Sequence, residues 1–285
     1  MENGLTGTES AESQFFQWID WSQPWLVPLH ETGVLLCQAG SQWREAFHVA
    51  ALRQGLCNHR GQPISLIPQA VLPAGVPYEA WIGATGQIPT RDNLHDFFNA
   101  LIWLTWPAVK ARLNGLQANE ITHQHLTVNQ TRGATTTRHR GGLRDALTLF
   151  DENAAIIVSS EPALLELLRS HCWDALFMAQ RGAFGKHCEV FLFGHALLEK
   201  LIAPYKSITA HAWLVVVDAD FFALERAEKR TWLDRIVAAR LDSRMRPADL
   251  TPLPVLGVPD WSMGQTAAFY GDVGVFRPPR RLSRQ

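Results

Sequence analysis

The segment from residue 92 to residue 105, DNLHDFFNALIWLT, constrains the fold most, because it is apolar on nearly every side. Thr90 or Asp92 is expected to cap it as a helix, and Pro107 marks its end or the start of a second helix over 107–117. A helix that is apolar all round belongs in the interior of a protein. Other elements of the chain must therefore pack around it.

Three polar side chains, His95, Asp96 and Asn99, interrupt this apolar helix. His95 and Asn99 are four residues apart and share one face, and Asp96 lies three residues before Asn99. Buried polar groups are costly unless they have partners. We expect those partners to be a metal, a substrate or other side chains, and a purely structural network is an equally open alternative.

The remaining patterns indicate an α+β fold, in which helices pack on a small mixed or antiparallel sheet. Without an internal repeat or a clear linker, residues 13–278 are expected to form a single domain, with flexible termini at 1–12 and 279–285. The polar segment 119–142 is expected to be a loop or arm. Apolar periodicity predicts helices over 9–19, 41–57, 161–170, 194–203 and 219–240, strands over 78–84, 188–193 and 210–217, and a β-hairpin over 146–159.

A second polar cluster lies in the predicted helix 194–203, where His195 and Glu199 share one face. Two ligands at this spacing are common in metal sites, although the pattern also occurs by chance. The first turn of a helix disfavours the imidazolium form of His195, and the neutral imidazole binds metals or acts as a base.

A third cluster surrounds the predicted hairpin. Arg144 and Asp145 lead into it, and Asp151, Glu152 and Asn153 form its tip. Residues of these types favour turns. The alternative is that a rigid hairpin presents the carboxylates and the amide to a metal or a substrate.

These clusters suggest a divalent-metal-assisted hydrolase that acts on an anionic substrate, for example a phosphorylated one. If so, the rings of His95 and His195 should lie within about 4–6 Å of each other at a pocket. The predicted catalytic residues are His95, Asp96, Asn99, His195 and Glu199. The predicted metal ligands are His95, Asp96, His195 and Glu199, and the predicted substrate contacts are Arg91, Arg144 and Asp145.

The alternative from another class is a binding module for nucleic acid or an acidic protein. Residues 91–150 hold seven basic and four acidic side chains, and the segment 277–285 holds four arginines. In this hypothesis Arg132, Arg138 and Arg140 contact the partner, and the His/Asp/Asn cluster only braces the fold. The net charge of −1 argues mildly against it. A third option is a structural protein in which the polar network stiffens a tryptophan-rich core.

The N-terminal segment has neither the basic nor the apolar region of a secretory signal, and no apolar stretch is long enough to span a bilayer. The four cysteines are scattered, which is typical of a reduced protein. We therefore expect a cytoplasmic protein with no membrane partner.

Four blocks of sequence together resemble the bacterial family called domain of unknown function 3025. The resemblance runs from about Ser13 to Pro278 and implies a bacterial origin. It implies no activity, cofactor or catalytic residue. The blocks are PTRDNLHDFFNALIWLTWPAVKARLN (89–114), RGGLRDALTLFDEN (140–153), FGHALLEKLIAPY (193–205) and LPVLGVPDW with a later FY and FRP (253–277).

Overall fold

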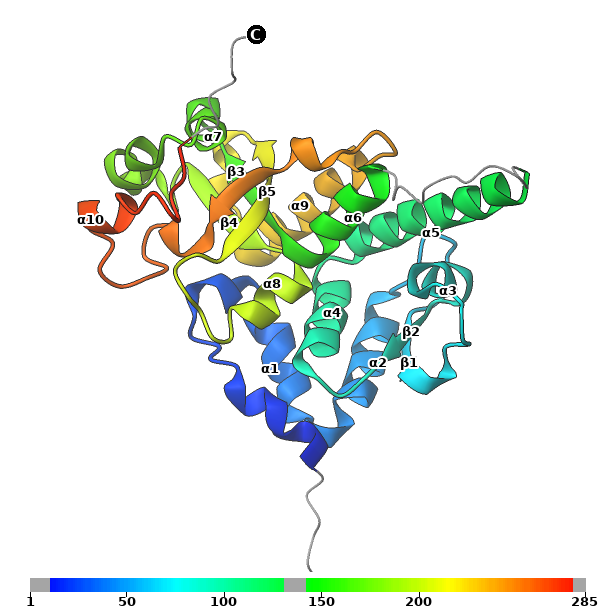
Figure 1. The fold of residues 1–285 in the computed structure, drawn as a ribbon. Helices are drawn as coiled ribbons and strands as arrows, with labels where there is room; N and C mark the ends of the chain where they lie inside the picture. The colour runs from blue at the N-terminus through cyan, green and yellow to red at the C-terminus, as the bar shows by residue number, and fades with distance from the viewer. Residues whose placement is uncertain (1–10, 131–141, 279–285) are drawn as a thin grey trace, which may run out of the picture.

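Helix α4 (Leu94–Thr105) is the buried helix that the sequence predicted, and it lies in the middle of the molecule (Figure 1). From Asp96 onward every one of its residues is buried. Asn93 caps the helix, since its side-chain oxygen accepts a hydrogen bond of 2.8 Å from the backbone N–H of Asp96. Thr90 and Asp92 were therefore the wrong caps.

The computed structural model describes residues 11–130 and 142–278. The other α-helices are α1 (His30–Gln38), α2 (Trp43–Gln54), α3 (Tyr78–Thr85), α5 (Pro107–Gln130), α6 (Gly142–Asn153), α7 (Pro162–Arg169), α8 (His195–Lys200), α9 (Arg226–Arg240) and α10 (Ala267–Tyr270). The strands are β1 (Ser65–Pro68), β2 (Gln87–Thr90), β3 (Ala154–Ser159), β4 (Cys188–Leu192), β5 (Thr209–Val216) and β6 (Thr251–Pro254). Short 3-10 turns and one π-helical turn (Asp174–Ala179) connect them.

The main sheet has four strands in the order β4-β3-β5-β6. Strand β3 is antiparallel to β4 and parallel to β5, and β5 is antiparallel to β6. The sheet is therefore mixed, and the predicted α+β class is confirmed. Strands β1 and β2 form a separate parallel pair beside α2 and α3.

The two faces of the main sheet are covered by different helices because side chains alternate along a strand. Phe191 and Trp213 lie on the face toward the centre of the molecule, where they contact the rings of Trp106 and Phe150 at 6.2 and 5.8 Å. Helix α7 lies against the opposite face, where its leucines gather around Ile157. The first face therefore joins the sheet to α4, α5 and α6.

The segment 78–84 is helix α3 and not the predicted strand. Apolar alternation over so few residues cannot separate a strand from a helix. The residue that follows favours the helix, because Gly86 adopts the left-handed conformation (φ 73°) that commonly ends helices. Glycine is required there, since a Cβ would not fit beside the Pro63 carbonyl. As a result, Tyr78 and Glu79 stand together in the first turn of a helix.

The predicted loop 119–142 is wrong over 119–130, since α5 continues to Gln130, and residues 131–141 lie outside the described part of the chain. The predicted hairpin over 146–159 is also wrong in its first half. Residues 142–153 form helix α6, which buries Ala146, Leu147 and Phe150 on one helical face. Only β3 remains of that hairpin.

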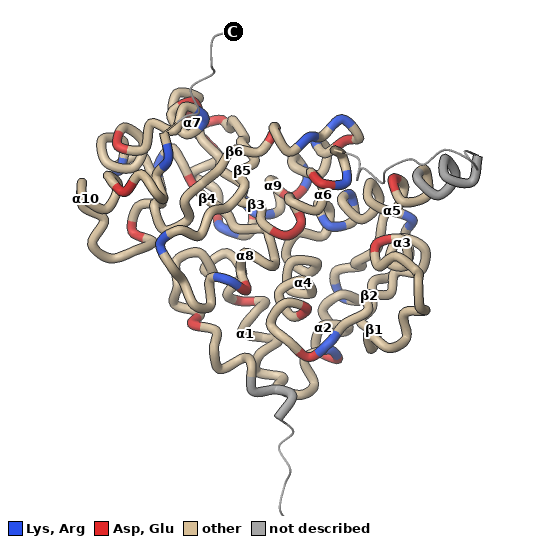
Figure 2. Tube along the Cα trace, in the orientation of Figure 1, with Lys and Arg blue, Asp and Glu red and all other residues tan. Residues whose placement is uncertain are grey.

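Among the described residues, no helix is both long and apolar enough to cross a membrane. The buried apolar side chains of the helices and of the main sheet form one continuous cluster. Basic and acidic residues are interspersed over the described elements (Figure 2). The predicted termini 1–12 and 279–285 lie almost entirely outside the described residues, which begin at Ala11.

Candidate functional site

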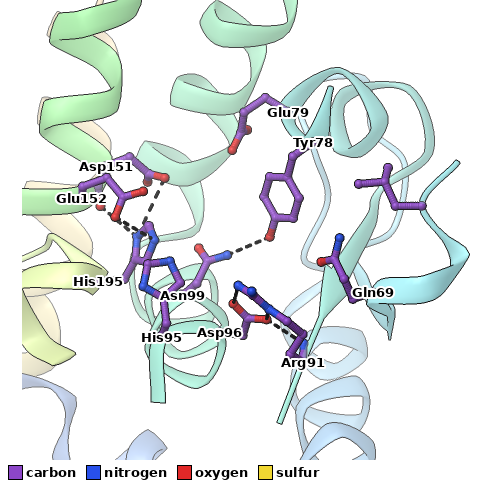
Figure 3. Close-up of a pocket in the computed structure, with 11 residues that line it drawn as sticks. Gln69, Tyr78, Glu79, Arg91, His95, Asp96, Asn99, Asp151, Glu152 and His195 are labelled. Atoms are coloured by element: carbon purple, nitrogen blue, oxygen red, sulfur yellow. Dashed lines mark hydrogen bonds and ion pairs between the residues drawn. The ribbon is translucent and has the colours of Figure 1, made fainter. Parts of the chain in front are cut away.

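A polar pocket of about 350 Å³ lies where α3, α4, α6 and α8 meet (Figure 3). It brings His95 of α4 and His195 of α8 together, with ring centroids 4.6 Å apart. That distance falls in the range expected of a site from the sequence. The pocket is lined by Gln69, Leu72, Tyr78, Glu79, Arg91, His95, Asp96, Asn99, Asp151, Glu152 and His195.

A close backbone contact places His195 beside the end of α6. Gly194 precedes α8, and a Cβ on it would lie 2.5 Å from both the Asn153 nitrogen and the Glu152 carbonyl oxygen. Its own N–H donates to the carbonyl of Ala154 at 2.9 Å. Because only glycine fits here, the last turn of α6 and the first turn of α8 lie against each other.

His195 is buried and its two ring nitrogens have different environments. Nδ1 is 2.9 Å from the backbone carbonyl of Asp151, which can only accept a hydrogen bond, so Nδ1 carries the proton. Nε2 then has a free lone pair and lies 3.4 Å from a carboxylate oxygen of Glu152. Burial lowers the pKa of His195 to about 4, so the ring is neutral at pH 7.

His95 is oriented in the same way by a carboxylate. Its Nδ1 is 2.9 Å from Oε2 of Glu199, a residue 104 positions later in the sequence. This contact joins α4 to α8. A proton on Nδ1 again leaves Nε2 as a lone-pair donor. One ligand atom each from His95, Glu152 and His195 lie within 4.8 Å of one another, which is close enough for the three residues to hold a metal ion.

Asp96 is committed to Arg91. Its Oδ2 accepts hydrogen bonds from the backbone N–H and Nε of Arg91 at 2.6 and 3.0 Å, and its Oδ1 accepts from Nη2 at 3.1 Å. Both oxygens of this predicted ligand are thus occupied. The guanidinium remains more than half exposed at the edge of the pocket.

A buried lysine holds the back of the pocket together. Lys110 of α5 donates to Asp151 Oδ1 at 2.6 Å and to Asn99 Oδ1 at 2.9 Å, and Asn99 Nδ2 donates to the Tyr78 hydroxyl at 3.0 Å. Burial alone would raise the pKa of Asp151, but the Lys110 ammonium, together with His195 and His95, lowers that pKa below its ordinary value. The Asp151 side chain is therefore a charged structural partner of Lys110.

Glu79 faces the same pocket from α3. Asn114 of α5 donates to Glu79 Oε2 at 2.7 Å and leaves the other carboxylate oxygen without a partner among the described residues. Burial, together with the charge of Asp151, raises the pKa of Glu79 to about 7. Burial also raises the pKa of Glu152. The pocket thus contains two carboxyl groups that hold their protons more tightly than usual.

The structure brings together most of the residues that the sequence singled out. His95, Asp96, Asn99, His195 and Arg91 line the pocket, and Glu199 bonds to His95 from outside it. The other two predicted substrate contacts, Arg144 and Asp145, lie in the first turn of α6 and are not among the lining residues. The arginines of the alternative binding hypothesis, Arg132, Arg138 and Arg140, fall outside the described residues.

Sequence reasoning missed Tyr78, Glu79 and Lys110. The first two were assigned to a strand, in which neighbouring side chains point to opposite faces. Lys110 had a detectable signal, because it is the one charged residue between Asp96 and Arg112 and follows the buried helix directly. A lysine in such a context requires a carboxylate partner.

The family described as "Protein of unknown function (DUF3025)" matches the chain over residues 64–280. That range includes every residue that lines the pocket, together with Lys110, Gly194 and Glu199. No curated protein and no solved structure matches the chain.

Proposed function

This chain belongs to the DUF3025 family, whose description names no activity, and from the pocket we propose that it is a metal-dependent hydrolase acting on an anionic substrate such as a phosphorylated compound. The observation that carries the proposal is the set His95, Glu152 and His195, whose ligand atoms lie within 4.8 Å of one another. Two histidines and a glutamate hold catalytic zinc in several hydrolases, and similar sets hold Fe(II). The set keeps both histidines of the sequence-based prediction and replaces Asp96 and Glu199 with Glu152.

The chain's own residues fit a divalent cation in two respects. Metal-binding histidines usually donate their second N–H to a carboxylate or a carbonyl, as His95 does to Glu199 and His195 to the Asp151 carbonyl. In addition, Glu79 and Glu152 form no ion pair with a lysine or arginine of the described chain. A divalent cation would balance these two carboxylates.

Each residue then has a role in hydrolysis. A divalent cation would supply the Lewis acidity that makes water a nucleophile near neutral pH. Glu79, with a pKa of about 7 and one carboxylate oxygen without a described partner, suits a general base that takes up a proton at that oxygen. Arg91 exposes its guanidinium at the pocket edge, where it can attract a substrate anion.

Titration calorimetry with Zn²⁺, Mn²⁺, Mg²⁺ and anaerobic Fe²⁺ tests the metal set. We expect one cation to bind the purified protein at one equivalent, and His95→Ala, His195→Ala and Glu152→Gln each to weaken it at least tenfold. His187→Ala is the matched control, because this histidine lies half-exposed in a surface pair with Glu161. The His187→Ala variant should bind the cation with the same affinity as the unmodified protein.

Hydrolysis of p-nitrophenyl phosphate and p-nitrophenyl acetate by the metal-loaded protein tests the reaction. We expect activity that chelation removes and that His195→Ala lacks. If the three site variants bound each of the four cations as tightly as the unmodified protein does, the metal set would be overturned. Hydrolysis that survives both chelation and His195→Ala would overturn the proposed reaction.

A further inference from the structure

Resting on the proposed function, we infer that Tyr78 binds the anionic group of the substrate. The hydrogen-bonded chain Lys110–Asn99 turns the phenolic O–H of Tyr78 into the pocket, where it donates to an oxygen of that group. The hydrogen bonds from Lys110 to Asn99 and from Asn99 to Tyr78 each have a fixed direction, which determines where the phenolic hydrogen points.

The direction is set at Lys110, because an ammonium group can only donate hydrogen bonds. Its Nζ is 2.9 Å from the side chain of Asn99, so the atom that faces it must be the amide oxygen. Asp151 holds Lys110 from the other side at 2.6 Å. The orientation of the Asn99 amide is therefore fixed by chemistry, with its NH₂ group pointing away from Lys110.

That NH₂ group donates to the Tyr78 oxygen at 3.0 Å. Because the Tyr78 oxygen accepts this bond, the phenolic hydrogen must point in another direction. No acceptor for it exists among the described residues, and Tyr78 lines the pocket. The O–H is thus free to donate to whatever occupies the pocket, and the positive charge at Lys110 strengthens it through the chain.

The pocket also keeps Tyr78 in its protonated, donating form. Burial raises the pKa of Tyr78 well above its ordinary value, and the negative charges of Glu79, Asp96 and Asp151 raise it further. A phenolate, which could only accept, is excluded at physiological pH.

Three hydrogen-bond donors, one of them Tyr78, lie on the wall opposite His195 (Figure 3). The others are Gln69, whose amide forms no hydrogen bond with a described side chain, and Arg91, whose guanidinium is exposed. A phenol, an amide and a guanidinium suit a group with several acceptor oxygens and a negative charge, such as phosphate or carboxylate. The wall is therefore the anion subsite, and the three metal-ligating residues form the opposite end of the pocket.

Inorganic phosphate, with acetate as a second probe, tests this subsite by NMR of protein labelled with ¹³Cζ-tyrosine. The chain has only three tyrosines, so three Tyr→Phe variants assign the signals. We expect phosphate to shift the Tyr78 signal and Tyr78→Phe to weaken phosphate binding about tenfold or more, as for a hydrogen bond to a charged group. Tyr205→Phe is the matched control, since Tyr205 is exposed at 56%.

The substitution Asn99→Asp tests the direction of the hydrogen bonds from Lys110 through Asn99 to Tyr78, with little change in the shape of the side chain. A carboxylate accepts from both Lys110 and Tyr78, so the Tyr78 O–H turns away from the pocket although the ring stays in place. We expect Asn99→Asp to lose as much phosphate affinity as Tyr78→Phe, and the double variant to lose no more than either. Repulsion by the added charge alone would instead make the double variant weaker than both.

Phosphate affinity that is equal in Tyr78→Phe and the unmodified protein, or a Tyr78 signal that phosphate does not move, would overturn the inference. Zinc calorimetry on the same variants keeps the two proposals apart, because Tyr78→Phe should bind zinc normally. If the unmodified protein binds no metal, the proposed function fails. The phosphate titration of the metal-free protein still decides the role of Tyr78.

Discussion

Replacing Lys110 with methionine should destabilise the protein by about 3–4 kcal/mol at pH 7. The side chains of Lys110 and Asp151 are exposed by only 5% and 8%, and their charged atoms lie 2.6 Å apart. Methionine has a similar length and can fill the space beside Trp103, over whose ring Lys110 Nζ now lies at 5.4 Å. The substitution Lys110→Met thus removes the charge and leaves most of the packing.

Two considerations set the magnitude. Removing one partner of a buried ion pair costs about 3–5 kcal/mol, because the other charge remains buried and unpaired. Asp151 can escape this cost by taking up a proton, which sets a ceiling. From an ordinary carboxyl pKa of about 3.9, protonation at pH 7 costs about three pKa units at about 1.36 kcal/mol each, or about 4 kcal/mol.

The same ceiling predicts a dependence on pH. In the unmodified protein the lowered pKa of Asp151 contributes stability that is present above the unfolded pKa and is lost as the pH falls. In Lys110→Met the ammonium no longer opposes burial, so the pKa of Asp151 rises and the variant loses stability as the pH increases. At pH 5 the ceiling is only about 1.5 kcal/mol, so the two proteins should differ less there than at pH 7.

Urea unfolding followed by tryptophan fluorescence, with EDTA present at both pH values, measures the effect. Lys186→Met is the matched control, because Lys186 is exposed and forms no ion pair with a described residue. The double variant Lys110→Met/Asp151→Asn should recover part of the loss, since no charge stays buried. A loss below about 1 kcal/mol at pH 7, or a loss of equal size at pH 5, would refute the reasoning.

Three further predictions concern the supports of the site and of the long helix. Gly194→Ala should cost about 1–3 kcal/mol by forcing α8 away from α6, and it should weaken metal binding by displacing His195; urea unfolding and zinc calorimetry measure the two effects. Glu199→Gln should lower metal affinity about 10–100-fold, because the glutamate orients His95; zinc calorimetry measures the loss. Asp234→Ala should cost about 1–2 kcal/mol in urea unfolding, because this carboxylate of α9 accepts the first free N–H groups of α5 at 2.9 and 3.0 Å.

The first two of these predictions have a matched control within the chain. Gly182→Ala adds a Cβ that meets no atom within 4 Å, so it should leave stability and metal affinity unchanged. Glu166→Gln changes an exposed glutamate of α7 and should leave metal affinity unchanged. An unaltered metal affinity in Glu199→Gln would show that His95 needs no partner. An unaltered free energy of unfolding in Asp234→Ala would show that solvent caps α5 equally well.

Local patterns were sufficient for the elements with a long and consistent period. The residues of α4 are apolar on all sides, so its burial could be predicted without any knowledge of the neighbours. The strands β4 and β5 lie close to the predicted ranges, since they are short apolar runs bounded by turn residues. The helices α3 and α6 were assigned wrongly because their short apolar patterns fit two periods, and the second half of α5 was taken for a loop because it is polar.

The candidate site divides in the same way. His95 and His195 could be selected from the sequence, because each is a polar residue in an apolar helix. Glu152 could not be chosen over Asp96 as a ligand. That choice depends on α6 ending immediately before β3, on the contact at Gly194, and on the commitment of Asp96 to Arg91.

The sequence by itself determined that a buried helix carries polar side chains and that these must have partners. The tertiary structure alone decided which partners they have: Glu199 for His95, Lys110 for Asn99, and Arg91 for Asp96. The physical reason is that the burial of a polar group can be predicted from its immediate neighbours along the chain. Its partner is supplied by an element distant in sequence, and the packing of the helices and the sheet brings that element into hydrogen-bonding distance.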